Sequence, residues 1–254
     1  MIAALPMYNQ PDCLAALGRY WALIRDGLRD GGVAAPDELS WGVHDFHAHW
    51  LDPALVLSQA CGYPFRAVLQ SKVTLIGTPE YGVAGCAPGY YRSVLVVRAD
   101  DDRDDLTAYQ AAMFAYNDPM SQSGWAAAQT HAQRHGFQFD NTALTGGHVA
   151  SAHAVKDGSA DIAAIDAVTW RLLLRNDPAL SALRVLAETD PTPGLPYIAA
   201  QGADRHATFR AIAAAISWLA PQDRDTLGIR GIVDIPASAY LGVPTPAPAF
   251  QSAH

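Results

Sequence analysis

Two stretches of small, uncharged polar residues stand where an apolar segment runs into a helical pattern. The first contains Ser121, Ser123 and Gly124, and the second contains Gly147 and His148. The first backbone N–H groups of a helix have no partner inside the helix, so such a place binds anions without a cation. Hydroxyls, amides and an imidazole would supply several donors, each contributing roughly 1.5–3 kcal/mol when the acceptor is charged. We therefore expect these residues to bind a small oxyanion.

Each of these residues also has a plainer interpretation. Serine is a preferred N-cap residue, so Ser121 or Ser123 could simply cap a helix. His148 could be an exposed loop histidine without a partner. Asp166 ends an apolar strand just before a helix, where it could bind a ligand amine or hydroxyl, accept from His148, or cap the helix. If Asp166 faces the ligand, a simple dianion should bind more weakly, because the carboxylate repels it.

Other candidate chemistry is weaker. His44, Asp45, His47 and His49 have the residue types of a metal site, and on an extended strand His47 and His49 would share a face. No second ligand cluster follows at a recognisable spacing, so we expect a polar surface loop, no metal site and no cofactor. Cys61, between a strand end and a glycine, could be a nucleophile, but a small apolar role is the expectation.

Composition narrows the class of protein. The chain has 254 residues, of which 50% are hydrophobic, so it can bury a large core and form two modest domains. A net charge of -8 and only two lysines argue against a nucleic-acid partner. No segment approaches the unbroken apolar run of about 20 residues that a membrane span needs. Three cysteines at unpatterned spacing indicate neither a disulfide framework nor a zinc site.

The elements that would position these residues alternate between strand and helix. We expect a helix that begins at Pro11 and ends at 30–32, with one buried face formed by Leu14, Leu17, Trp21, Ile24 and Leu28. A later helix is expected over 205–219, with Trp218 in the core. Further helices are expected at 122 onward, 148 onward and 167–175, and strands at 2–5, 55–59, 73–77, 93–98 and 161–165. The charged run 100–105 is expected to be a solvated turn, because six consecutive charges cannot be packed.

This order predicts a discontinuous first α/β domain, residues 1–95 and 195–254, with a second α/β domain, residues 96–194, inserted into it. The prolines near 191–196 favour an extended return segment. Two lobes joined by two strands would form a hinge and a ligand cleft that closes. The chain begins with a strand and no leader, so it acts in the cytoplasm or has lost a leader.

Several motifs resemble those of the phosphonate-binding family of ABC-transporter substrate-binding proteins. They occur in the family's order and are found at 5–8, 57–64, 91–97, 117–124, 146–148 and 158–166. The resemblance implies a two-lobed type II periplasmic-binding-protein fold, a periplasmic location and an ABC permease partner. It also implies Ser121, Ser123 and His148 as anion donors. Tyr8, Gln59, Tyr63 and Tyr91 would surround the ligand. Ala60 departs from the family's threonine, so one hydroxyl donor is missing.

The expected function is therefore a solute-binding protein, without turnover, that closes on a phosphonate, phosphate or phosphate ester for ABC-type import or sensing. The alternative is a cytoplasmic enzyme on the same scaffold, similar to those of thiamine-pyrimidine or menaquinone-precursor biosynthesis. Its candidate acid, base or nucleophile would be Cys61, His148 and Asp166. A ligand-sensing domain that reports to a partner protein is a third possibility.

Overall fold

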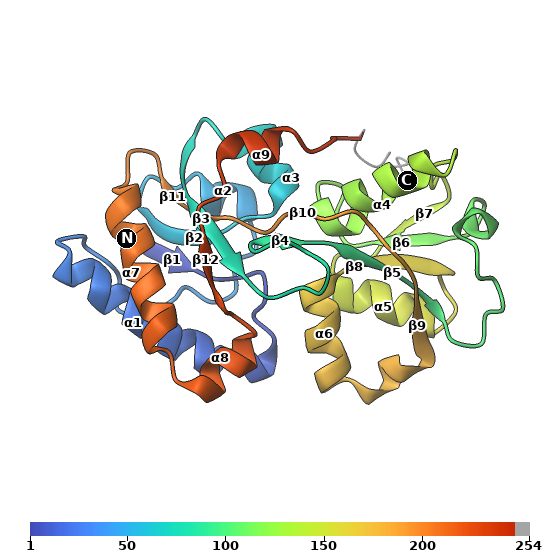
Figure 1. Cartoon of the computed structure of the whole chain (residues 1–254), viewed down its shortest axis with the longest axis horizontal. Coiled ribbons are helices and arrows are strands. Elements are labelled where there is room, and N and C mark those ends of the chain that lie inside the picture. Colours follow the sequence, from blue (N-terminus) through green and yellow to red (C-terminus); the bar gives the residue numbers. More distant parts are fainter. Residues whose placement is uncertain (247–254) are drawn as a thin grey trace. The chain divides into compact units, whose positions relative to one another are not determined.

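The computed structural model describes residues 1–246, and the chain divides into two compact units (Figure 1). Unit 1 consists of Met1–Tyr90 and Pro193–Gly242, and unit 2 consists of Tyr91–Thr192 and residues 243–246. The chain leaves unit 1 at β4 (Tyr90–Tyr91) and returns at β10 (Thr192–Pro193), and these two short strands pair with each other. Residues 247–254, which the sequence-based prediction placed in the first domain, lie outside the described residues.

Unit 1 is built on a mixed five-stranded sheet in the order β1-β2-β11-β3-β12. Its strands are β1 (Ile2–Ala4), β2 (Leu55–Gln59), β3 (Val73–Glu80), β11 (Tyr197–Ala200) and β12 (Gly231–Val233). β1 and β2 run parallel, while β11 pairs antiparallel with both β2 and β3. The predicted extended return segment, residues 185–197, is confirmed in part by β10 and by the first residue of β11. β11 inserts between two strands from the first part of the chain.

The helices of unit 1 pack on this sheet through apolar faces. α1 (Leu14–Asp30) follows η1 (Pro11–Cys13), buries Leu17, Trp21, Ile24 and Leu28, and packs against α7 (Arg205–Trp218). α7 in turn contacts β3 and β12. The remaining helices are α2 (Phe46–Trp50), α3 (Gly62–Pro64), the π-helix η2 (Phe65–Leu69), α8 (Pro221–Leu227) and α9 (Ala237–Leu241).

Two predicted core residues of unit 1 are in fact exposed. Leu14 keeps 40% of its surface accessible because it begins α1, and Trp218 keeps 79% because it ends α7. The inward positions of α7 are Ile212, Ala215 and Ile216, and Trp218 lies at the edge of this face in the last residue of the helix, where its side chain is left exposed. The prediction that Trp218 packs in the core was therefore wrong.

Unit 2 has its own five-stranded sheet in the order β7-β6-β8-β5-β9. Its strands are β5 (Ser93–Arg98), β6 (Phe114–Tyr116), β7 (Thr142–Leu144), β8 (Ile162–Asp166) and β9 (Leu183–Glu188). β6 runs parallel to β7 and β8, and β5 runs antiparallel to β8 and β9. Buried valine, isoleucine and alanine from β5 and β8 form the centre of its core. Continuous apolar runs suit strands that are covered on both faces.

Four helical segments of unit 2 follow directly after strands or turns. The π-helix η4 (Gln122–Ala126) runs into α4 (Ala127–Arg134), and α5 (His148–Lys156) packs on β5, β6 and β8. α6 (Ala167–Asn176) starts at the end of β8. The 3-10 segments are η3 (Leu106–Tyr109) and η5 (Pro178–Ala182). Over residues 1–246, no helix combines the length and the apolar character needed to cross a bilayer.

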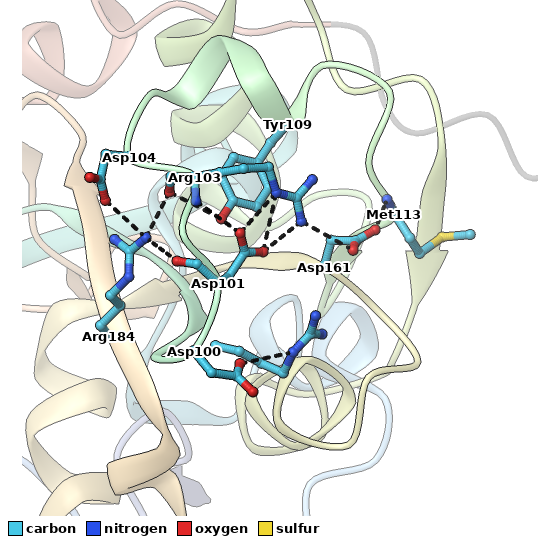
Figure 2. Close-up of polar contacts among 9 residues, drawn as sticks. Asp100, Asp101, Arg103, Asp104, Tyr109, Met113, Asp161 and Arg184 are labelled. Carbon is cyan, nitrogen blue, oxygen red and sulfur yellow. Dashed lines mark hydrogen bonds and ion pairs between the residues drawn. The ribbon is translucent and has the colours of Figure 1, made fainter.

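The acidic run 100–105 is only partly the predicted solvated turn, because Asp100, Asp102, Asp104 and Asp105 are exposed while Asp101 and Arg103 are not (Figure 2). The side chain of Asp101 is only 7% exposed, and its Oδ2 accepts from Nη2 of Arg103 at 2.6 Å. The Arg103 guanidinium lies over the ring of Tyr109, 4.0 Å from its centroid. Arg184 Nη2 donates to the carbonyl oxygens of Asp101 and Arg103, at 2.7 Å each. An aspartate can be packed here because two arginines supply charge-assisted hydrogen bonds.

Candidate functional site

The first predicted anion motif forms a buried helix start. Ser121 is the N-cap residue, and its Oγ accepts from the backbone N–H of Gly124 at 2.9 Å. The carbonyl of Ser121 accepts from the N–H of Ala126, five residues on, which makes the first turn a π-helix. π-turns of this kind occur frequently at functional sites. Ser121 and Ser123 are 5% and 3% exposed. The capping interpretation is confirmed for Ser121, and the roles of both serines in anion binding stay predictions.

The second motif brings His148 to the same place. His148 is the first residue of α5, and its Nε2 lies 2.9 Å from Oγ of Ser123. Oγ of Ser123 is in turn 3.5 Å from Oγ of Ser121. The alternative of an exposed loop histidine without a partner was therefore wrong. Two helix starts that are separate in sequence meet because β6, β7 and β8 are neighbours in one parallel set.

The imidazole of His148 is uncharged at neutral pH. Burial lowers its pKa to about 4, although the nearby backbone of Ala164 acts in the opposite direction. Its other ring nitrogen, Nδ1, is buried and has no well-aligned hydrogen-bond partner within residues 1–246. The site therefore consists of hydroxyls, amides and a neutral imidazole. Such a set can bind an anion only through hydrogen bonds and the helix dipole.

Asn117 belongs to this site, although it was not predicted as a site residue. A Cβ atom added to Gly124 would lie 1.7 Å from Oδ1 of Asn117 and 3.3 Å from Cε1 of His148. Glycine is required at 124 because the Asn117 amide occupies the space of a side chain. Oδ1 of Asn117 is buried, and no donor within residues 1–246 reaches it. The signal available in the sequence was the position of Asn117 directly after the strand β6.

Asp166 lies at the end of β8, where it caps α6. Its Oδ1 accepts from the backbone N–H groups of Val168 and Thr169, at 2.7 and 3.0 Å. Asp166 also stands opposite Ser93 in the β5–β8 ladder, and Ser93 Oγ donates to the carbonyl of Ser123 at 2.9 Å. Asp166 is 2% exposed. The capping interpretation is confirmed, and a role in ligand binding stays a prediction.

The other predicted ligand contacts are also buried. Within unit 1, Tyr8 and Gln59 line a small cavity, in which Tyr8 meets the ring of Tyr81 edge-on at 4.8 Å. Also in unit 1, the ring of Tyr63 lies 4.8 Å below the guanidinium carbon of Arg66. Tyr91, in β4, is 3% exposed. The roles of Tyr8, Gln59, Tyr63 and Tyr91 in ligand binding stay predictions.

The histidine-rich segment does not have the predicted strand geometry. Asp45 accepts from the N–H of Ala48 at 2.9 Å and caps the short helix α2, so His47 and His49 do not share a strand face. His49 Nε2 instead lies 3.0 Å from Oγ of Ser58. Across the described part of the chain, no group of three His, Cys, Asp or Glu residues is placed to hold a metal ion.

Comparison with known proteins gives a clear family assignment. The model of the family described as "ABC transporter, phosphonate, periplasmic substrate-binding protein" matches residues 53–239. The chain belongs to this family. The resemblance predicted from the sequence motifs is thereby confirmed, and a solute-binding role follows from it. Members of this family are periplasmic proteins that deliver a small ligand to an ABC permease. A search of curated proteins gives no significant match.

Solved structures show the same fold at low sequence identity. PhnD1 from Prochlorococcus marinus, in complex with methylphosphonate, has a TM-score of 0.71 and 17% identity, with 94% of each chain covered. The binding-protein component of an ABC phosphonate transporter from Pseudomonas aeruginosa has a TM-score of 0.66 and 18% identity, with 89% and 77% covered. XAC2383 from Xanthomonas citri, bound to chloride, has a TM-score of 0.69 and 12% identity, with 94% and 92% covered. The type II periplasmic-binding-protein fold is thus confirmed.

Proposed function

We propose that this protein binds a small oxyanion, a phosphonate, phosphate or phosphate ester, for ABC-type import. The observation that carries the proposal is the 2.9 Å contact between Ser123 Oγ and His148 Nε2, next to the capped amide of Gly124. It unites the two helix starts into one group of neutral donors. The family description names phosphonate, and this favours a phosphonate among the three ligand classes.

The donors suit a tetrahedral anion. The hydroxyls of Ser121 and Ser123 can each reorient, and the N–H of Ser123 lies in a first helical turn, where it has no partner inside the helix. Each hydrogen bond to a charged group contributes roughly 1.5–3 kcal/mol, so three or four of them can hold an anion without a formal positive charge. Asp166, at the end of the neighbouring strand, is the candidate acceptor for a hydrogen bond from a ligand amine or hydroxyl.

We also propose that the protein has no catalytic turnover. A serine hydroxyl beside a histidine is the geometry of a nucleophile and its base. Such a base needs a third group on its other nitrogen, and Nδ1 of His148 has no carboxylate partner within residues 1–246. A pKa of about 4 also makes His148 a poor base at neutral pH. Incubation with p-nitrophenyl acetate and p-nitrophenyl phosphate should therefore release no p-nitrophenol above background.

Isothermal titration calorimetry tests the proposed ligand class. The protein would be titrated with methylphosphonate, phosphite, phosphate, glycerol phosphate and, as a neutral control, glycerol. We expect saturable binding at one site per chain for at least one phosphorus oxyanion and none for glycerol. Absence of binding for every oxyanion would overturn the proposal.

Transport can be separated from sensing in the host organism. If the protein serves import, deletion of its gene should abolish growth on the bound oxyanion as the sole phosphorus source. A sensor would leave growth on that source intact and change gene expression instead. Growth unaffected by the deletion would contradict the import role.

A further inference from the structure

The oxyanion site contains a buried acceptor that no donor of residues 1–246 reaches. Oδ1 of Asn117 is buried, lies against Gly124 and is close to the ring of His148. Within residues 1–246, Ser121 Oγ accepts from the N–H of Gly124 and contacts Ser123 Oγ. Ser123 Oγ also contacts His148 Nε2, and the carbonyl of Ser123 accepts from Ser93 Oγ. A buried acceptor without a donor is unfavourable, so a ligand that brings a donor would be favoured there.

In the part of the chain that the structure describes, the site also has no cation to balance a doubly charged ligand. Within residues 1–246, the Ser123 hydroxyl contacts His148, the backbone of Ala164 acts on its pKa, and the Asn117 amide lies on the same side of Gly124 as its ring. None of these groups is charged. No lysine or arginine of residues 1–246 bonds to Ser121, Ser123 or His148. The buried carboxylate of Asp166 stands opposite Ser93, which bonds the carbonyl of Ser123. Both facts disfavour a second negative charge on the ligand.

We propose that the site selects an oxyanion that carries one negative charge and one O–H group, and that Asn117 Oδ1 accepts the hydrogen of this group. The matching ligand is the singly protonated form of a phosphonate, phosphite or phosphate. Its deprotonated oxygens take the hydroxyl and amide donors, and its P–O–H pairs with Asn117. Fully ionised sulfate and sulfonates have the same shape but no hydrogen for this acceptor. This inference rests on the proposed oxyanion-binding function.

Two ligands of matched shape test it by calorimetry. Methylphosphonate offers an O–H when singly ionised, and methylsulfonate does not. We expect the wild-type protein to bind methylphosphonate at least about 100-fold more tightly, since a site built to pair a ligand hydroxyl strongly rejects the analogue without it. In Asn117→Ala the ratio should fall to within about tenfold, because the acceptor is gone. Asn117→Asp keeps an acceptor, so it should keep the preference for methylphosphonate, while its negative charge weakens the binding of both anions.

The pH dependence supplies an independent readout. Above the second pKa of methylphosphonate, its affinity should fall about tenfold for each pH unit, because only the singly charged form binds. Thermal melts of each variant would verify that it is folded before titration. Equal affinity for the two ligands, or an affinity for methylphosphonate that does not fall with rising pH, would overturn the proposed selectivity while the oxyanion-binding function stands. Absence of binding for both ligands, phosphite and phosphate would overturn both.

Discussion

Oγ of Ser123 lies 2.9 Å from Nε2 of His148, which joins two helix starts that are 25 residues apart in the chain. The contact lies wholly within unit 2, where η4 and α5 begin beside parallel strands. It turns two sequence motifs, each of which could have been a simple helix cap, into one site. Because both partners are neutral, one of their two hydrogens forms the contact: either the hydroxyl donates to Nε2 or Nε2–H donates to Oγ, and the other hydrogen is left for another acceptor.

Replacement of Ser123 by alanine should weaken ligand binding strongly. The variant loses one donor to a charged ligand, and roughly 1.5–3 kcal/mol of binding free energy with it, or about 10- to 150-fold in Kd. Calorimetry with methylphosphonate measures the change. Ser159→Ala is the matched control, because Ser159 is exposed and its hydroxyl bonds only the carbonyl of Ala154. Equal affinities for the two variants would show that Ser123 does not contact the ligand.

Gly124→Ala should damage both the site and the stability of the fold. The new methyl group would lie 1.7 Å from Oδ1 of Asn117, so the Asn117 side chain must move. We expect a loss of about 1–3 kcal/mol in the free energy of unfolding, as for other overpacked positions, and weaker methylphosphonate binding. Gly231→Ala is the control, since nothing lies within 4 Å of its added Cβ and Gly231 lies in β12 of unit 1, outside both predicted anion motifs. Urea denaturation and calorimetry would compare them, and indistinguishable variants would refute the packing described for Asn117.

Protonation of His148 should destabilise the protein in mild acid. The pKa of His148 is about 4 in the folded chain, against an ordinary value of 6.5, so between these values the unfolded chain binds more protons. The free energy of unfolding should therefore fall as pH drops from 6.5 to 4 and gain no further contribution from this group below pH 4. In His148→Gln this dependence should be shallower, while His49 and His131, whose pKa values burial also lowers, still contribute.

Urea denaturation at several pH values between 4 and 7 gives the comparison directly. The wild type and His148→Gln should differ most in the slope of unfolding free energy against pH. Parallel curves would contradict the assignment of a buried neutral imidazole at position 148.

Asp101→Asn should destabilise unit 2. The substitution removes the charge that holds Arg103, and it leaves Arg103 above Tyr109 without its nearest carboxylate. A loss of about 1–3 kcal/mol is expected for a charge-assisted bond of a largely buried partner. The exposed Asp102 provides the control variant Asp102→Asn, which should change the unfolding free energy by less than about 0.5 kcal/mol. Similar unfolding midpoints for the two would contradict the packed arrangement in Figure 2.

Local sequence patterns were sufficient for most elements of the fold. The 3.6-residue spacing of Leu17, Trp21, Ile24 and Leu28 correctly predicted α1, and the apolar runs at 55–59 and 93–98 correctly predicted β2 and β5. Patterns failed where a residue's surroundings are set by distant segments. Trp218 is apolar and was expected in the core, but its side chain is exposed at the end of α7. Asp101 is charged and was expected in solvent, but its side chain is largely buried beside Arg103, and Arg184 binds its carbonyl oxygen.

The sequence predicted the two helix starts that form the candidate site, but it did not predict the contacts between their residues. Serine, glycine and histidine near a strand end indicate an anion site, and Ser121, Ser123 and His148 do lie together. For Asn117 the sequence offered only its position after β6, and its packing against Gly124 depends on the fold. The neutral state of His148 also depends on burial, which sequence spacing does not determine.

A structure determined with the tightest-binding phosphorus oxyanion tests the central claim most directly. The predicted result places the oxyanion within hydrogen-bonding distance of Ser121, Ser123 and His148, with a further oxygen facing Asn117. An oxyanion bound elsewhere, with the Ser123–His148 contact unchanged and no ligand atom near it, would contradict the account.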